Sequence, residues 1–523
     1  MTDQHVLTID LGTSGPKAAV VTSTGCVVGS ARAAVRTTFG SGGAAEQDAE
    51  AVWTATLDAA RGALADAGVE PASVLAIAAS SQYSSVVPVD AEGKPVAPMI
   101  TWMDQRGSPK RLKRLPGYPK RGNTPQQLLQ YVRVHGLAPI QSGMSLMHMR
   151  WFRYARPELY ERTAAFLEPV DYLTARFTGR NTANQCTSLM QMLADNREVP
   201  STGWHPDLVA SSLIDADRLP EWVGVGSEVG PLLPEVAETL GLPATTPVLS
   251  GINDTQAGAV AAGAFSGSHA GLALGTTSVI VTHLDKKKLN PLRSLFTMPS
   301  PIGTKHLLSA ENGVAGVAVD YFLDNVVYPD DHFTTPASVD DRYQAFNDAA
   351  AAASPGASGV LFLPWLRGSL APQADGKIRG GFLNIGLDTI RNDLARAVLE
   401  GVALNLRWLQ GPVETFLDRS ISHYVFYGGG ARSDLWAQVM ADVLGKPVHQ
   451  LADAGFANSL GTAMFAFERL GIVEAAEVSK RVEVHAVYEP DAATRARYDD
   501  LAGIFADAFK RTRPILHRLN KRH

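Results

Sequence analysis

The chain has few of the residues on which covalent cross-links and metal centres depend. Its 523 residues include two cysteines, Cys26 and Cys186, which excludes a disulfide framework and a cysteine-rich zinc site. No two of its 13 histidines stand four residues apart, so the helical histidine pair of many zinc enzymes is absent.

Two common catalytic motifs are absent as well. Gly-Lys occurs at Gly93, Gly376 and Gly445 but is never followed by Ser or Thr, which excludes a phosphate-binding loop of the Walker type. No serine lies in a Gly-x-Ser-x-Gly pattern, so the nucleophile turn of the α/β-hydrolases is missing.

Neither sign of charge dominates, and no long hydrophobic run stands out. The net charge of −5 disfavours a nucleic-acid binder that works by neutralising phosphates. The basic run 510–523 is expected to be a solvated terminal helix. The most apolar stretch, 258–282, is interrupted by small polar residues and His269, so we expect no membrane span. The polar segment 1–5 has no signal-peptide core, and we expect a cytoplasmic protein.

What the chain does contain is enough apolar sequence for a large core. Apolar residues make up 45% of the chain, and its length suits about three domains or two large ones. The opening predicts three strands, over 6–9, 17–22 and 26–35, joined by tight turns. A predicted helix over 48–68 and a strand over 74–78 follow, which indicates a mixed sheet in an α/β domain.

A short pattern recurs half a chain apart. Gly12-Thr13-Ser14 and Gly275-Thr276-Thr277-Ser278 each form a small-residue turn between apolar strands. Tight turns favour these residues anyway, yet two copies suit two related domains that face each other across a cleft. The copies differ where Asp10 corresponds to Ala273. The expected units are 1–250, 251–490 and a C-terminal helical tail, 491–523.

Both turns suit the binding of phosphate groups, and two aspartates lie at expected strand ends. Glycine lets backbone N–H groups approach a phosphate, and Thr or Ser hydroxyls add donors. Asp10 is either a functional carboxylate, since a carboxylate at the end of an apolar strand is costly unless used, or an ordinary turn residue. Asp254, between an expected strand over 247–250 and a small-residue helix, suits a catalytic base or a helix N-cap. An ordinary Asp pKa near ~3.9 would be adequate for the base.

Several segments, in order along the chain, are similar to one family. Asp10-Leu-Gly-Thr-Ser-Gly-Pro-Lys17 resembles the first phosphate hairpin of the FGGY carbohydrate kinases, and Gly275–Ser278 resembles their second. Trp102-Met-Asp-Gln-Arg106 resembles their sugar-contacting loop. Gly251–Gly258 resembles the segment that holds their catalytic aspartate, and Gly428–Asp434 continues the match.

The resemblance implies a fold, an activity and a set of site residues. The fold would be two α/β domains of the ribonuclease-H-like (actin-like ATPase) type with a cleft between them. The activity would be phosphorylation of a small sugar or polyol by ATP with Mg²⁺, with Asp254 as general base and Asp10 at the metal. The residues implied for the nucleotide are Gly12, Thr13, Ser14, Lys17, Gly275, Thr276, Thr277, Gly429, Gly430, Ala431 and Asp434. Those implied for the sugar are Gln82, Tyr83, Ser84, Trp102, Asp104, Arg106 and Asp254.

Several of these residues also have plainer interpretations. Lys17 suits a solvated strand position equally well. Trp102 and the charged residues after it suit a core aromatic beside a surface ion pair. The three glycines from Gly428 suit an ordinary turn, and Asp434 suits the N-cap of a helix that ends at Leu444.

The sugar loop departs from the pattern of the xylulokinases in this family. They usually carry Gly-Gln-Met-His-Gly, and this chain has Ser81-Gln82-Tyr83-Ser84-Ser85. Thr255 and Gly368-Ser369-Leu370 also stand where these kinases often have Asn and Gly-Glu-Arg. A serine hydroxyl at position 84 is shorter than the histidine it replaces. We therefore expect another ketose, a polyol or a deoxy sugar, and not D-xylulose, to be the best substrate.

Two other classes of function are open at this point. The hairpins alone also fit an actin- or chaperone-like ATPase that acts on a protein partner, or a catalytically weak sugar sensor. An ATPase that acts on a protein partner would give the loop at Trp102 no evident role. A weak sugar sensor would not need both Asp10 and Asp254. The expected ligands are a small sugar or polyol and ATP, without nucleic acid or membrane, and the chain could form a homodimer.

Overall fold

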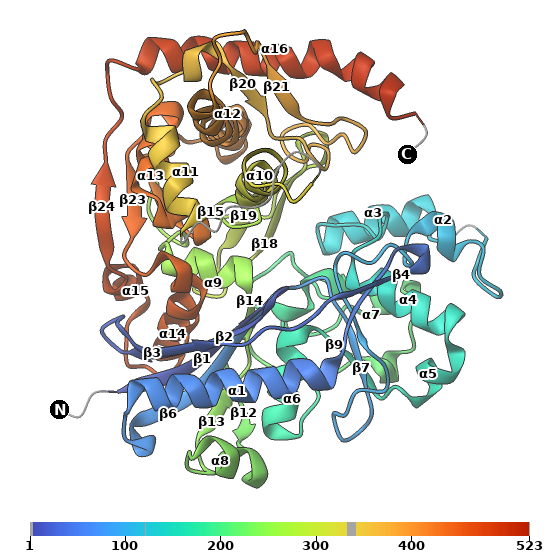
Figure 1. Ribbon diagram of the computed structural model, residues 1–523. Helices are drawn as coiled ribbons and strands as arrows, with labels where there is room; N and C mark the ends of the chain where they lie inside the picture. The colour runs from blue at the N-terminus through green and yellow to red at the C-terminus, as the bar shows by residue number, and fades with distance from the viewer. Residues whose placement is uncertain (1–3, 121, 332–340, 522–523) are drawn as a thin grey trace.

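The computed structural model describes residues 4–120, 122–331 and 341–521. Figure 1 shows two α/β domains, stacked one above the other in this view, with the N-terminal one drawn from blue to green. This architecture confirms the predicted α/β class with two domains. Within the described ranges, no helix is long and apolar enough to cross a membrane.

The first domain is built on a seven-stranded mixed sheet. Six of its strands follow the order β12-β13-β6-β1-β2-β3, and the seventh strand, β14, pairs with β6. β1 runs antiparallel to β2 and parallel to β6, which confirms the predicted opening of the chain. Because β14 belongs to this sheet, the sheet extends past residue 250. The strands are β1 (His5–Gly12), β2 (Gly15–Thr22), β3 (Val27–Arg32), β6 (Val74–Ser81), β12 (Glu228–Pro231), β13 (Pro247–Leu249) and β14 (Ile252–Asn253).

Helices and short strands surround this sheet. Helix α1 (Ala49–Ala67) packs against β2 and β3; it begins at the N-cap Asp48 and ends at Gly68 in the left-handed conformation. The other helices are α2 (Pro109–Leu112), α3 (Pro125–Val134), α4 (Ser145–Ala155), α5 (Pro157–Arg162), α6 (Pro169–Thr178), α7 (Pro206–Ser211) and α8 (Pro234–Leu240). The short strands are β4 (Thr38–Gly40), β5 (Ala44–Gln47), β7 (Val87–Val89), β8 (Met99–Ile100), β9 (Ala165–Leu167), β10 (Thr182–Ala183) and β11 (Glu221–Trp222).

The second domain is built on an eight-stranded sheet in the order β17-β18-β19-β16-β15-β22-β23-β24. β15 runs antiparallel to β16 and parallel to β22, which repeats the arrangement of β1 with β2 and β6. The short sequence repeat therefore corresponds to a structural repeat. The strands are β15 (Ala270–Leu274), β16 (Thr277–Leu284), β17 (Leu289–Asn290), β18 (Leu295–Pro299), β19 (His306–Val314), β22 (Tyr424–Tyr427), β23 (Val448–Leu451) and β24 (Val484–Tyr488).

The longest helix described is α12 (Arg391–Leu417) of the second domain. Helices α11 (Arg342–Ala351), α13 (Asp434–Leu444) and α16 (Arg495–Leu519) pack against it. A two-stranded sheet of β20 (Leu361–Leu363) and β21 (Gly381–Leu383) lies beside them. This domain also contains α10 (Gly316–Phe322) and α15 (Ala475–Arg481).

The C-terminal helix α16 packs on the second domain along much of its length. The buried ring of Phe505 lies 5.3 Å from the ring of Trp365. Near the end of the helix, Arg513 Nε forms an ion pair of 2.6 Å with the buried Asp375. The expected terminal helix is present and residues 510–521 are exposed or half-buried, but Arg513 is also paired with a buried carboxylate.

Two helices join the domains. They are α9 (Asp254–Ala261), which follows β14 directly, and α14 (Ala457–Arg469), which contacts both α9 and strands β1 and β6 of the first domain. The two helices pack closely at Gly461, where a Cβ atom would lie 1.9 Å from the carbonyl oxygen of Ala257. A side chain at Gly461 would push these helices apart, so the glycine sets the spacing at the domain junction.

Candidate active site

The first hairpin, between β1 and β2, carries Asp10 at the domain junction. Gly12 pairs with Gly15 across the turn. Gly15 has φ 132°, and a Cβ there would lie 2.1 Å from a backbone oxygen, so only glycine fits. The carboxylate of Asp10 is 5% exposed and accepts hydrogen bonds from Ser80 Oγ at 3.1 Å and Asn458 Nδ2 at 3.4 Å. Because Asn458 belongs to α14, Asp10 contacts both domains.

Lys17 stands opposite Asp10 in β2 and also reaches the second domain. Its Nζ donates a hydrogen bond of 3.4 Å to the carbonyl oxygen of Gly455. Burial raises the pKa of Asp10, and the charge of Lys17 offsets part of that increase. Lys17 is thus neither fully solvated nor free of protein contacts, and Ser14 is the exposed residue of the hairpin.

Asp254 is the first residue of α9 and lies near Asp10. The N-cap of α9 is Asn253, whose side chain accepts the N–H of Gln256 at 2.9 Å, while the Gln256 amide accepts the N–H of Asn253 at 3.1 Å. The interpretation of Asp254 as the N-cap is therefore wrong. Its carboxylate accepts the N–H of Thr255 at 2.7 Å and the hydroxyl of Thr255 at 3.4 Å.

The surroundings of Asp254 raise its pKa to about 7. Burial is the main cause, and repulsion from Asp10 and, to a smaller extent, Glu311 adds to it, while hydrogen bonds from Thr255 act in the opposite direction. The expectation of an ordinary Asp pKa is therefore wrong. The reason is that the fold withdraws Asp254 from solvent and, to a smaller extent, places the buried carboxylate of Asp10 near it.

The loop after β6 contains Gln82, Tyr83 and Ser84. Burial raises the pKa of Tyr83, and the negative charge of Asp254 raises it further. Ser84 has φ 62°, an unfavourable backbone conformation for serine. The buried Glu168 supports this loop by accepting the N–H of Ser85 at 3.3 Å. The loop is therefore held in one conformation beside the two aspartates.

The loop at Trp102 presents one exposed aromatic side chain, with 38% of the residue exposed. Asp104 is fully buried, and its carboxylate accepts hydrogen bonds from the backbone of Arg106 at 2.7 Å and from Arg106 Nε at 2.9 Å. Arg106 also pairs with Glu46 at 2.6 Å, and its guanidinium lies 4.1 Å from the ring of Trp151. Asp104 and Arg106 are thus paired with each other, and they shape the loop that carries Trp102.

Hydrogen bonds connect the first hairpin to both of these loops. The hydroxyl of Thr13 donates to Gln82 Oε1 at 2.7 Å and accepts the indole N–H of Trp102 at 3.2 Å. The buried side chain of Gln47 donates to the carbonyl oxygen of Thr13 at 2.7 Å and accepts from Gln82 Nε2 at 3.3 Å. Thr13, Gln82 and Gln47 therefore form a closed ring of hydrogen bonds, which we call the glutamine ring.

The second hairpin and the glycine run before α13 line a cavity of about 470 Å³ in the second domain. A Cβ on Gly275 or Gly429 would meet no atom within 4 Å, so both glycines border open space. Tyr343 closes part of the cavity, and its hydroxyl donates to Asp320 at 2.7 Å. The lining includes Gly275, Thr276, Gly316, Asp320, Tyr343, Asn347, Gly429, Gly430, Ser433 and Trp436.

The remaining residues predicted for the nucleotide lie around this cavity without lining it. Ala431 is buried, and Thr277 is half-buried at the start of β16. Asp434 is exposed, and Gln450 Nε2 donates to its carboxylate at 3.1 Å. The N-cap of α13 is Ser433, whose hydroxyl accepts the N–H of Trp436, so the prediction that Asp434 caps this helix is wrong.

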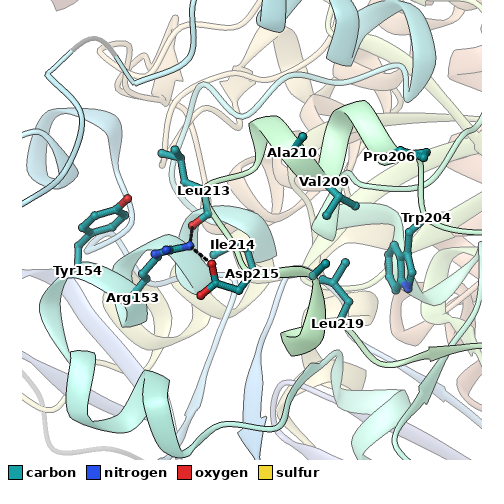
Figure 2. A pocket seen from close by; sticks show the side chains of 11 residues that line it. Arg153, Tyr154, Trp204, Pro206, Val209, Ala210, Leu213, Ile214, Asp215 and Leu219 are labelled. Atoms are coloured by element: carbon teal, nitrogen blue, oxygen red, sulfur yellow. Dashed lines mark hydrogen bonds and ion pairs between the residues drawn. The ribbon is translucent and has the colours of Figure 1, made fainter.

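Another cavity, of about 680 Å³, opens between α4, α7 and residues 213–219 of the first domain (Figure 2). Its lining is mostly apolar, with Trp204 at one end and Arg153 at the other. Arg153 Nη1 donates to the carbonyl oxygen of Leu213 at 2.9 Å and pairs with Asp215 at 2.8 Å. None of the predicted site residues lines this cavity.

The structure thus groups the predicted residues in two places. The residues predicted for the sugar and the metal meet at the domain junction, and those of the second hairpin meet at the cavity. Sequence reasoning missed Gln47 and Asn458. Gln47 is the last residue of β5, in a short polar run before α1, which is a weak signal. Asn458 had none, because 448 residues separate it from Asp10.

Comparison with known proteins gives a consistent assignment. The N-terminal domain model of the FGGY family of carbohydrate kinases matches residues 5–261, and the C-terminal domain model of that family matches residues 270–468. Xylulose kinase from Bacillus subtilis (strain 168) is 26% identical over 516 residues, which cover 98% of both chains.

Solved structures share the fold along nearly the whole chain. Gluconate kinase from Lactobacillus acidophilus has a TM-score of 0.82 at 21% identity, and 98% of each chain is covered. Ligand-bound xylulose kinase from the same species has a TM-score of 0.83 at 20% identity, with 97% of this chain and 98% of that chain covered. Since the two family models match most of the sequence in the expected order, the chain belongs to the FGGY family of carbohydrate kinases.

Proposed function

We propose that this carbohydrate kinase transfers the γ-phosphoryl group of ATP to one hydroxyl of a small sugar or polyol at the domain junction, with Asp254 as general base. The observation that carries the proposal is the position of Asp254. It is the first residue of α9 at the domain junction, and its carboxylate interacts electrostatically with the hairpin carboxylate of Asp10 and with the sugar loop residue Tyr83. Family membership favours this function over an ATPase that acts on a protein partner and over a weak sugar sensor.

Asp254 would accept the proton of the sugar hydroxyl while the hydroxyl oxygen forms its bond to the γ-phosphorus and the bond to ADP breaks. A pKa of about 7 suits this role, because proton transfer is most effective when the pKa of the base is close to the working pH. The N-cap of α9 is supplied by Asn253, so the carboxylate of Asp254 is not needed to stabilise the helix end.

Asp10 is suited to contact Mg²⁺. The buried carboxylate of Asp10 and the half-buried carboxylate of Asp254 repel each other here, and a cation would relieve that repulsion. Within the described residues, no group of three or more acidic, histidine or cysteine side chains could hold a metal alone. This fits Mg²⁺, which commonly binds through one or two carboxylates together with substrate phosphates. When bound, the ion would neutralise charge on the phosphates.

The sugar would lie between Trp102 and the loop of Gln82. The exposed indole offers a flat apolar wall for C–H groups, and Gln82, Tyr83 and Ser84 offer hydrogen bonds to hydroxyls. Asp104 and Arg106 would act indirectly, because their charges are paired with each other. The substrate classes that we propose are a ketose other than D-xylulose, a polyol or a deoxy sugar.

The cavity of the second domain is proposed as the nucleotide site. Gly275, Thr276 and the glycines before α13 would surround the phosphates and ribose, and Tyr343 and Trp436 would bound the base. Lys17, Gly12 and Ser14 would approach the phosphates from the first domain. We also propose the division 1–250, 251–490 and 491–523 for the units.

A substrate panel tests the proposal most directly. The enzyme is incubated with ATP and Mg²⁺ and, in turn, with ketoses, aldoses, sugar acids, deoxy sugars and polyols, and ADP release is recorded. We expect at least one sugar or polyol to accelerate ADP release, and Asp254→Asn to reduce that rate by about 10²–10⁴-fold with nucleotide binding retained. A variant with nearly the wild-type rate would show that Asp254 is not the base.

A further inference from the structure

The glutamine ring of Thr13, Gln82 and Gln47 has hydrogen bonds that can run in only one direction. An indole N–H can only donate, so the hydroxyl oxygen of Thr13 must accept from Trp102. The single proton of that hydroxyl then goes to Gln82 Oε1, at 2.7 Å. The direction of each bond therefore follows from the chemistry of Trp102.

Gln47 fixes the orientation of the other two members of the ring. Its Nε2 donates to the carbonyl oxygen of Thr13 at 2.7 Å and to Thr37 Oγ1 at 3.1 Å, so its Oε1 must be the acceptor for Gln82 Nε2. This orientation turns Gln82 Oε1 toward the Thr13 hydroxyl. Gln47 is 1% exposed and Gln82 is 4% exposed, so water does not compete for these bonds.

The ring holds the only hydroxyl proton of Thr13 away from the phosphate side of the hairpin. A phosphate oxygen can only accept, so Thr13 can donate to it only after its bond to Gln82 is released. Trp102 and Gln82 belong to the two loops proposed for the sugar. A sugar hydroxyl that donates to Gln82 Oε1 would weaken the bond from Thr13 and make that proton available to the nucleotide.

We propose that Gln47 is a positioning residue that couples sugar binding to phosphate binding at the first hairpin. With no sugar present, the glutamine ring holds Thr13 in a state that cannot donate to the γ-phosphate, which limits wasteful ATP hydrolysis. With sugar present, the ring opens and Thr13 donates to the phosphate. This inference rests on the proposed function for the identity of the loops, but not for the hydrogen bonds themselves.

The test compares two rates in the same variants of the full chain. Idle hydrolysis is ADP release with ATP and Mg²⁺ alone, and productive turnover is ADP release with the best sugar of the panel, D-xylulose and D-gluconate included. Gln47→Met keeps the length of the side chain and removes all three hydrogen bonds. The matched control is Gln185→Met: Gln185 is also 1% exposed and hydrogen-bonded, but its partners lie in residues 195–201.

We expect Gln47→Met to raise idle hydrolysis and to lower productive turnover, so that their ratio falls about tenfold or more, as expected for the loss of about one buried hydrogen bond. Gln185→Met should change both rates by the same factor. Thr37→Val, which removes only one acceptor of Gln47, should change the ratio in the same direction but less. An equal loss in both rates for Gln47→Met would overturn the inference.

Hydrogen exchange of residues 10–17 supplies a second readout. In the folded wild type the hairpin amides should exchange faster when the sugar is added without nucleotide, and in Gln47→Met they should already exchange faster without sugar. If the sugar leaves the wild-type hairpin unchanged, the coupling is absent. If no sugar of the panel is phosphorylated by the wild type, the proposed function fails, while the effect of Gln47→Met on idle hydrolysis still decides the role of Gln47.

Discussion

Asp254→Asn should make the nucleotide-free protein more stable above neutral pH while it strongly reduces turnover. The physical reason is the environment of Asp254. Burial and the neighbouring carboxylate of Asp10 raise its pKa from 3.8 to about 7. A carboxylate that must ionise in such a place destabilises the fold, whereas an asparagine stays neutral at every pH.

The sign and size of the effect follow from proton linkage. The folded state binds the Asp254 proton more tightly than the unfolded state, so wild-type stability is highest below the unfolded pKa and falls until the pH passes about 7. About three pKa units correspond to at most about 4 kcal/mol. Because the carboxylate is partly exposed, solvent screening reduces this to about 2 kcal/mol. For a domain of this size, a change of about 2 kcal/mol in unfolding free energy corresponds to a Tm shift of about 4–8 °C.

The assay is thermal unfolding of both proteins between pH 5 and pH 8, without nucleotide and with a chelator to remove divalent cations. We expect the Tm of Asp254→Asn to exceed that of the wild type at pH 8 and the gap to narrow toward pH 5. Asp375→Asn serves as the control of opposite sign. Burial tends to raise the pKa of Asp375, but hydrogen bonds from Arg513 and His517 outweigh it and lower that pKa.

The control should lose stability, and the loss should persist at pH 8, because Asp375 is ionised and paired throughout this range. A wild-type protein that is as stable as Asp254→Asn at pH 8, or a Tm gap that does not change with pH, would refute the electrostatic account of Asp254. The catalytic role of Asp254 would then have to be judged from turnover alone.

Three further predictions concern the metal, the domains and the substrate. Asp10→Ala should raise the Mg²⁺ concentration needed for half-maximal rate and change the KM of the sugar much less, because only the first hairpin carries a carboxylate. A Mg²⁺ titration that overlays the wild type would show that Asp10 does not contact the metal. The domains should close when a nucleotide analogue and the sugar are both bound, since the proposed base lies at their junction and water must be excluded; solution scattering should show a smaller radius of gyration, and an unchanged profile at saturation contradicts closure. D-xylulose should not be the best substrate, because Ser84 leaves a sugar hydroxyl without its histidine partner. The expected loss is about 5- to 150-fold in specificity. Values of kcat/KM across the panel that rank D-xylulose first would disprove this prediction.

Local patterns predicted much of the fold. The three opening strands, the helix after them and the recurrence of the hairpin in the second domain could be read from alternating apolar residues and small-residue turns. Such features depend on neighbours a few residues apart. Helix ends were harder, because adjacent polar residues compete for the cap: Asn253 caps α9 where Asp254 was an option, and Ser433 caps α13 in place of Asp434.

The sequence by itself determined the fold class, the two hairpins and the identity of the acidic residues, because each of these is encoded in a short segment. Only the tertiary structure decided the electrostatic and hydrogen-bonding environment of those residues. Asp10 and Asp254 come from separate segments, and their mutual repulsion, which shifts the pKa of Asp254, arises only when β1 and α9 meet at the junction. Likewise, Gln47 joins the sugar loop to the first hairpin only because the fold buries three distant segments together. Electrostatic and hydrogen-bond energies depend on distance and solvent exposure in space, and the spacing of residues along the chain specifies neither.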